Sequence, residues 1–196
     1  MKRVIIPAVS ALLVVLQAGC AGPIKQETLS AQISQDLNLA SAGIHATSNG
    51  YFALASRSSK YGSWSSCAVA TTAEEFLLYV PETIYSDTEP DDIDGGNQVA
   101  TGTELVLDIQ LPYREIIGVA NLLSGKSHQV QLLTTLGILA LELTGQGTTL
   151  LDAESARNIY DTIRANGVPE FTPKHRIGVS AGTPLLLPLP LPITVF

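Results

Sequence analysis

The chain has 196 residues and an acidic balance, with 11 Lys and Arg against 18 Asp and Glu and a formal net charge of −7 at pH 7. A surface of this sign argues against partners that are bound through a basic patch, so we expect no nucleic acid among them. The length suits a single domain with its own hydrophobic core.

The first 19 residues have the three regions of a secretory signal peptide. Lys2 and Arg3 supply a positive start, an apolar run follows over 4–16, and small residues lead up to Cys20. The apolar run is too short to span a bilayer as a mature helix. We therefore predict that the chain is exported and that residues 1–19 are removed.

The end of this segment, Leu16-Gln17-Ala18-Gly19-Cys20, resembles the lipobox of bacterial lipoproteins. The resemblance covers the signal region alone, and Gln17 stands where the family prefers Leu. It implies cleavage before Cys20, lipidation of that cysteine, a tether over 20–26 and a single globular domain over 27–196. The alternative is an ordinary signal peptide, with Cys20 removed or left unmodified.

Lipidation would decide where the protein works. Each buried methylene contributes about 0.8 kcal/mol, and two or more acyl chains give durable attachment to a membrane. The residue after Cys20 is Ala21 rather than Asp, so the family's sorting tendency implies the outer membrane rather than the inner membrane. The resemblance thus implies a lipid-anchored protein of the cell envelope.

The N-terminal part of the mature chain is predicted to contain a helix and a hairpin. Apolar residues recur at helical spacing over 27–40. Asn49-Gly50 lies between two short segments, 44–47 and 51–54, and suits a two-residue β-hairpin turn. The Ser-rich stretch 56–66 is predicted to be a loop.

The middle of the chain gives one ambiguous element and one clear strand. Thr72 and Glu75 have capping-box spacing, yet the run 76–80 before Pro81 fits a strand equally well. Residues 82–103 are predicted to form a polar, acidic loop. The alternating segment 104–111, closed by Pro112, is predicted to be a strand.

Three helices are predicted over 113–123, 129–143 and 152–165. The second is apolar nearly all round, which is typical of a buried core helix. The third begins at the N-cap Asp152 and ends at Asn166-Gly167. Near the C-terminus, prolines at 188, 190 and 192 place their missing N–H groups on one side of an extended chain. We therefore predict an edge strand over 184–196, in a hairpin with 174–180.

Together these elements predict an α+β fold, in which a small antiparallel sheet with N- and C-terminal hairpins packs against three or four helices. With Cys20 lipidated, Cys67 has no cysteine partner, and no disulfide is expected. No internal repeat is found in the sequence, and no cofactor is predicted.

Cys67 is the first candidate for chemistry. The segment Trp64-Ser65-Ser66-Cys67-Ala68-Val69-Ala70 resembles the strand-to-helix entry of papain-like cysteine peptidases. That resemblance implies a thiol nucleophile at Cys67, with His128 and then Asp152 or Asn158 following in the family's order. The competing interpretation is a small buried thiol that packs as a hydrophobic group.

The second candidate is an acidic cluster with calcium-type oxygen ligands. It consists of Asp87, Glu89, Asp91, Asp92 and Asp94, with Glu82 just before it. The spacing does not match an EF-hand, so a solvated loop competes with a calcium site. The histidines, His45, His128 and His175, are not at metal-ligand spacing.

The function predicted from the sequence is therefore a binding or accessory role at a membrane surface. The protein would be a non-enzymatic envelope lipoprotein. Its lipid anchor would attach it to the membrane, and its partner would be another envelope protein. Two alternatives remain open: a papain-like hydrolase that uses Cys67, and a carrier of an apolar ligand. The second alternative rests on the leucine-rich segments 130–143 and 185–195.

Overall fold

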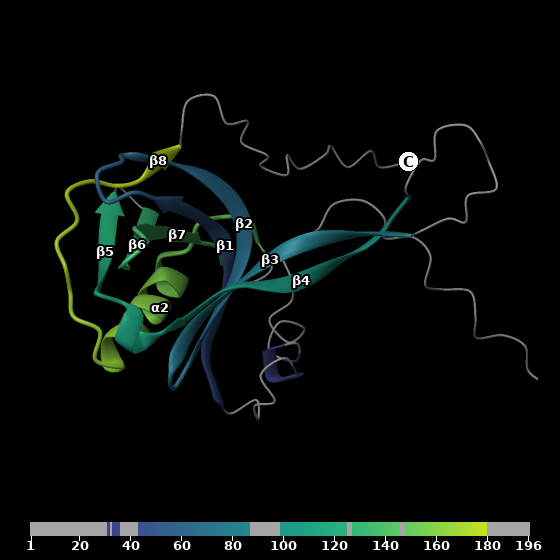
Figure 1. The fold of residues 1–196 in the computed structure, drawn as a ribbon, viewed down its shortest axis with the longest axis horizontal. Helices are drawn as coiled ribbons and strands as arrows, with labels where there is room; N and C mark the ends of the chain where they lie inside the picture. Colours follow the sequence, from purple (N-terminus) through teal and green to yellow (C-terminus); the bar gives the residue numbers. More distant parts are fainter. Residues whose placement is uncertain are drawn as a thin grey trace, which may run out of the picture.

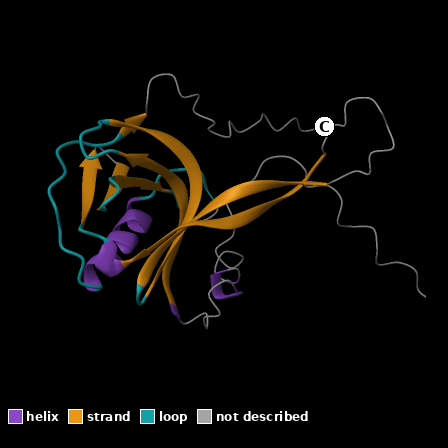
Figure 2. Cartoon of the chain, viewed as in Figure 1, coloured by secondary structure: helices purple, strands orange, loops and turns teal. Residues whose placement is uncertain are grey.

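The computed structural model describes residues 31, 33–35, 43–86, 99–124, 127–145 and 148–179. These residues form one sheet and one long helix (Figure 2). The strands are β1 (Ile44–Ala55), β2 (Tyr61–Thr72), β3 (Glu75–Ser86), β4 (Val99–Pro112), β5 (Gly118–Ser124), β6 (Ser127–Leu133), β7 (Ile138–Leu143) and β8 (Gly178–Val179). The sheet order is β4-β3-β2-β1-β7-β6-β5, all antiparallel, and β8 pairs in parallel with β2 at its start.

The sheet curves around α2 (Ala153–Ala165), which lies in its hollow (Figure 1). The face toward α2, here called the inner face, carries the main core. Alternate residues of β6 and β7 point inward and pack with Ile159 and Ile163 of the helix. Because strand side chains alternate between faces, the neighbouring residues of the same strands form the outer face.

The outer face is covered at two places. Near β3 and β4, Ile33 is fully buried against Ala68, Leu77 and Tyr79. At the other end, Ile177 packs on Ala53 and Ala140. The outer face therefore carries two small packing clusters, and the part of the sheet between them is less covered.

Residues 172–179, here called the C-terminal strap, make the second cover. After α2, the chain first follows the free edge of β5, where the Val119 N–H donates to Pro169 O and the Phe171 N–H donates to Val119 O. The strap then crosses the outer face and reaches β2, where the Gly178 N–H donates to Lys60 O at 2.8 Å. The chain from Pro169 to Val179 thus links β5, at one end of the sheet, to the beginning of β2.

The hairpin of β3 and β4 extends beyond the rest of the sheet (Figure 1). β3 pairs with β2 only between Phe76 and Tyr79, whereas its pairing with β4 continues to Ser86. The acidic residues 87, 89, 91, 92 and 94 come between β3 and β4 in the sequence and lie outside the described residues, so the calcium prediction stays a prediction.

The predicted α+β class with three or four helices is wrong, because the chain is mostly β. The segment 129–143 forms β6 and β7, joined by a turn, instead of a core helix. β7 is buried on both faces, so it shows a continuous apolar run without the alternation of a half-exposed strand. The segment 113–123 forms the short 3-10 turn η2 (Tyr113–Glu115) and then β5.

The predicted hairpin at Asn49-Gly50 is also wrong, since β1 runs through both residues without a turn. Gly50 serves packing instead: an added Cβ would lie 2.5 Å from Glu142 O of β7. The Ser-rich stretch is only partly a loop, because β2 begins at Tyr61. Glycine at this position allows the backbones of β1 and β7 to approach closely. In the sequence, an Asn-Gly pair that serves this purpose looks the same as one that forms a turn.

The 72–75 motif occurs in a β-turn rather than at a helix start. The Thr72 hydroxyl accepts from the N–H groups of Glu74 and Glu75, at 3.2 and 3.1 Å. The same bonds would cap a helix, but here they close the turn between β2 and β3. The run 76–80 is therefore a strand, one of the two structures that the sequence allowed.

Two predicted elements are confirmed. The strand 104–111 lies within β4, which ends at Pro112, and the third helix is α2. Gly167, with φ +87°, follows α2 in the left-handed conformation that suits a helix end. The predicted strand 184–196 and most of the predicted helix 27–40 lie outside the described residues. In the described ranges, no helix has the apolar length needed to cross a bilayer.

We expect Asp152→Ala to destabilise the fold by about 1 kcal/mol, the usual contribution of an N-cap. Hydrogen bonds from the Ser155 hydroxyl and N–H, at 2.7 and 2.8 Å, hold the pKa of Asp152 below its ordinary value. A lowered folded-state pKa stabilises the fold above the unfolded pKa, and the effect is lost as pH falls through the folded pKa. Urea unfolding of both proteins should show a constant difference at neutral pH that shrinks below about pH 4.

Asp152→Asn is the matched control for this prediction, because the amide oxygen still accepts a hydrogen bond but does not titrate. The difference in the free energy of unfolding between wild type and Asp152→Asn should contain only the pH-dependent contribution of the carboxylate. A wild-type minus Asp152→Ala difference that stays the same down to about pH 2 would contradict the assignment of the effect to the carboxylate.

Candidate binding site on the outer face of the sheet

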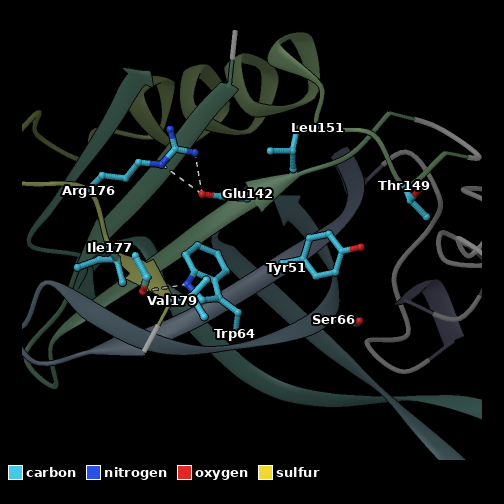
Figure 3. Close-up of a pocket in the computed structure, with 10 residues that line it drawn as sticks. Tyr51, Trp64, Ser66, Glu142, Thr149, Leu151, Arg176, Ile177 and Val179 are labelled. Carbon is cyan, nitrogen blue, oxygen red and sulfur yellow. Dashed lines mark hydrogen bonds and ion pairs between the residues drawn. The ribbon is translucent and has the colours of Figure 1, made fainter. Parts of the chain in front are cut away.

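A pocket of about 410 Å³ opens on the outer face, beside the C-terminal strap (Figure 3). β1, β2 and β7 form its floor, the strap forms one wall, and the loop after β7 forms another. It is lined by Tyr51, Trp64, Ser66, Glu142, Thr149, Leu151, Arg176, Ile177, Gly178 and Val179.

The floor follows from strand register. Tyr51 of β1 stands opposite Ser66 of β2 on one side and opposite Glu142 of β7 on the other. Trp64 lies two residues before Ser66, and therefore on the same face. The sheet thus brings two aromatic rings and one carboxylate to a single surface, although they come from three strands that are far apart in the sequence (Figure 3).

An ion pair forms the polar end of the pocket. Arg176 Nη2 lies 2.7 Å from Glu142 Oε1, and Arg176 Nη1 donates to Ser127 Oγ at 2.9 Å. Both charged side chains are partly exposed, at 26% and 22%. Exposed pairs of this kind contribute little to stability, so the pair matters mainly because it positions the two charges at the pocket.

Gln129 of β6 fixes the strap next to the pocket. Its side chain is fully buried and forms hydrogen bonds with both backbone groups of Ile177: Oε1 accepts from the N–H at 2.9 Å, and Nε2 donates to the C=O at 3.0 Å. Nε2 also donates to Glu142 Oε1 at 3.0 Å. One amide therefore acts on the strap as a neighbouring strand would, and also holds the pocket's carboxylate.

Further bonds hold the strap on both sides of Ile177. Gln131 Nε2 donates to His175 O at 3.1 Å, and His175 Nε2 lies 2.7 Å from Ser59 O. Trp64 Nε1 donates to Gly178 O at 3.3 Å, which fixes the indole against the strap. The pocket wall is thus built in advance, as is common in sites that bind small groups.

The pocket offers mainly apolar contact, with a polar end. Trp64, Tyr51, Leu151, Ile177 and Val179 supply apolar or aromatic surface, and Glu142 and Arg176 supply one charge of each sign. Such a lining suits an apolar side chain or an acyl group with a polar neighbour. In the part of the chain that the structure describes, no three His, Cys, Asp or Glu side chains gather as a metal site.

The three candidate residues for hydrolysis lie in different surroundings. Cys67 is buried in the middle of β2, within the inner core, and burial raises its thiol pKa. His128 lies on β6 with Nδ1 3.0 Å from Asn121 Oδ1, whereas Asp152 caps α2. No hydrogen bond joins any two of the three in the described ranges. A protonated thiol inside the core lacks the exposure and the depressed pKa of reactive cysteines.

Sequence patterns missed the residues of this pocket. Tyr51, Trp64 and Glu142 lie on strands that were predicted as a hairpin, a loop and a helix, and nothing in their spacing relates them. One pattern could have indicated a strand here. Gln129 and Gln131 alternate with apolar residues, and this spacing of two fits a strand better than a helix. Cys20 lies outside the described residues. No protein-family model matches the chain, and no curated protein matches it significantly.

Proposed function

We propose that the chain is an envelope lipoprotein, tethered through Cys20, which binds another envelope component in the pocket on the outer face. The observation that carries this function is the preformed hollow of about 410 Å³ between two aromatic rings and a fastened strap. Its charged groups are already paired with each other, which suits recognition better than acid–base chemistry. The outer membrane is the proposed location, on the basis of the residues around Cys20.

Photo-crosslinking in living bacteria tests the binding role with the full chain, including its signal segment. A photoreactive residue at Thr149, on the pocket wall, should capture one envelope component. The same residue at Leu136, which is 91% exposed in the turn between β6 and β7, should not capture it. Trp64→Ala should weaken the Thr149 crosslink about tenfold, the equivalent of one lost apolar anchor of about 1.4 kcal/mol.

Two further variants separate the tether from the pocket. Cys20→Ala should move the protein into the aqueous phase during detergent partitioning, since the acyl chains supply the membrane affinity. Cys67→Ala should leave the crosslink intact, whereas a thiol hydrolase would lose its activity. Equal crosslinking from positions 149 and 136, unaffected by Trp64→Ala, would contradict the binding site.

The apolar lining also favours a second candidate function, the carriage of an apolar ligand. An acyl chain in the pocket would contact Trp64, Leu151 and Ile177, with its polar group beside the ion pair. Native mass spectrometry of the purified protein distinguishes the two functions. A co-purifying lipid that Trp64→Ala releases supports carriage, and an empty pocket supports the binding of a protein component.

A further inference from the structure

Among the described residues, one edge of β2 beside the pocket has no partner strand over a short stretch. β2 pairs with β1 from Ser63 to Thr72 on one side. On its other side, β8 meets only Tyr61 and Gly62, and β3 begins to pair at Ala68. No described residue pairs with β2 on that side over 63–67, which we call the open edge. Five strand residues span about 17 Å, enough for a short extended peptide.

The hydrogen bonds around the open edge show which backbone groups it presents. Lys60 O accepts from the Gly178 N–H, so Lys60 faces β8. Backbone groups alternate between the two edges of a strand, so those of Trp64 and Ser66 face the same way. The groups of Ser63, Ser65 and Cys67 face β1 instead. The open edge therefore presents two donors and two acceptors, in the arrangement that an added strand requires.

The side chains beside the open edge differ between the two faces. Trp64 and Ser66 point to the outer face and line the pocket. Ser63 and Ser65 point to the inner face and are exposed there. A strand placed on this edge would have one row of side chains next to the pocket and the other next to serine hydroxyls and solvent.

We propose that the open edge binds an extended segment of a partner protein, with alternating apolar and polar residues, by adding it to the sheet as a strand. Its backbone pairs with Trp64 and Ser66, and one apolar side chain enters the pocket. Main-chain bonds then supply affinity and the pocket supplies specificity. β8 shows that this edge accepts a parallel strand directly beside the gap. The inference rests on the proposed function and names its ligand class.

Selection from a random peptide library tests the proposal, with the full acylated chain in detergent micelles as the target. Enriched peptides should alternate apolar and polar residues and should lack proline at every second position. On binding, the amides of Trp64 and Ser66 should become protected from hydrogen exchange. The amides of Ser63 and Ser65 already pair with β1 and should change little. Failure to enrich such peptides overturns the proposal.

Two substitutions at one position make the test specific. Ser66→Pro removes an N–H that faces the open edge, so the ladder with β1 stays complete, and proline is tolerated at such edge positions. It should weaken binding of the selected peptide at least tenfold. Ser66→Ala removes the hydroxyl but keeps the backbone N–H, so it should weaken binding much less than Ser66→Pro does. Equal binding to Ser66→Pro and wild type overturns strand addition, as does unchanged exchange at Trp64.

The outcomes also separate this inference from the proposed function. Peptide binding that depends on Trp64 but not on the Ser66 N–H leaves the pocket as a binding site and overturns only the strand. If crosslinking from positions 149 and 136 is equal, the pocket is not the binding site, and the proposed function fails together with this inference. A peptide that binds only after deletion of residues 180–196 assigns the edge to the chain's own C-terminal residues and overturns a partner's role.

Discussion

Gln129→Leu is expected to destabilise the protein by about 3 kcal/mol and to loosen the C-terminal strap. Leucine is similar in size to glutamine but has no polar atoms. The substitution therefore leaves the N–H and C=O of the buried Ile177 without their hydrogen-bond partners. An unsatisfied buried group costs about 1–3 kcal/mol, and two are created. The strap can lower that cost by detaching and taking up water, so we expect peeling of residues 172–179 before global unfolding.

Urea unfolding measures the first effect, and limited trypsin digestion measures the second. Lys174 and Arg176 lie in the strap and are the last basic residues of the chain, so cleavage there reports its detachment. The pocket wall leaves with the strap, and the Thr149 crosslink should be lost at temperatures where the sheet is still folded.

Gln131→Leu is the matched control, because Gln131 lies two residues further along β6 and is equally buried. Its Oε1 has no hydrogen-bond partner, whereas its Nε2 donates to Gln129 Oε1 at 2.7 Å and to His175 O, at the margin of the strap, at 3.1 Å. Neither of these bonds reaches the backbone groups of Ile177, which Gln129 would still hold. Removing an unsatisfied acceptor offsets part of the lost bonds, so we expect a change below about 1 kcal/mol. Equal losses in the two variants would show that Gln129 has no special role in holding the strap.

The elements that the sequence predicted correctly are those whose signals are local. α2 has its N-cap, its helical apolar stripe and its terminal glycine within 16 residues of chain, from Asp152 to Gly167. β4 has alternation and a closing proline. In both cases one face is solvated, so the periodicity of the element is visible in its composition.

The helix predicted over 129–143 was wrong because the strands there, above all β7, are covered on both faces. β7 lies between α2 on the inner side and Ile177 of the strap on the outer side, so its run of apolar residues has no period. The outer face of β7 is covered by the C-terminal strap, which lies more than 30 residues later in the chain. A local sequence pattern cannot predict this contact. The same cause hid the pocket, because its residues meet only through the register of three strands.

Gly50→Ala is expected to cost about 3 kcal/mol, although it adds one methyl group. The new Cβ would lie 2.5 Å from Glu142 O and 2.9 Å from Leu143 Cα, and both are backbone atoms of β7. A side chain could rotate away, but here two central strands must separate, which strains the sheet on both sides of the contact. Glu142 belongs to the displaced strand, so the ion pair with Arg176 and the polar end of the pocket should shift as well.

Gly178→Ala provides the comparison, because it lies in a strand and its added Cβ would be 3.5 Å from the Tyr61 ring, an ordinary contact. We expect this variant to remain within about 0.5 kcal/mol of wild type. For a domain of this size, a loss of 3 kcal/mol lowers Tm by about 10 °C, which calorimetry resolves easily. If both variants melt within about 2 °C of wild type, β1 and β7 do not approach as closely as the fold requires. Tyr51 and Glu142, which stand opposite each other on these two strands, would then be less closely held at the site than the register implies.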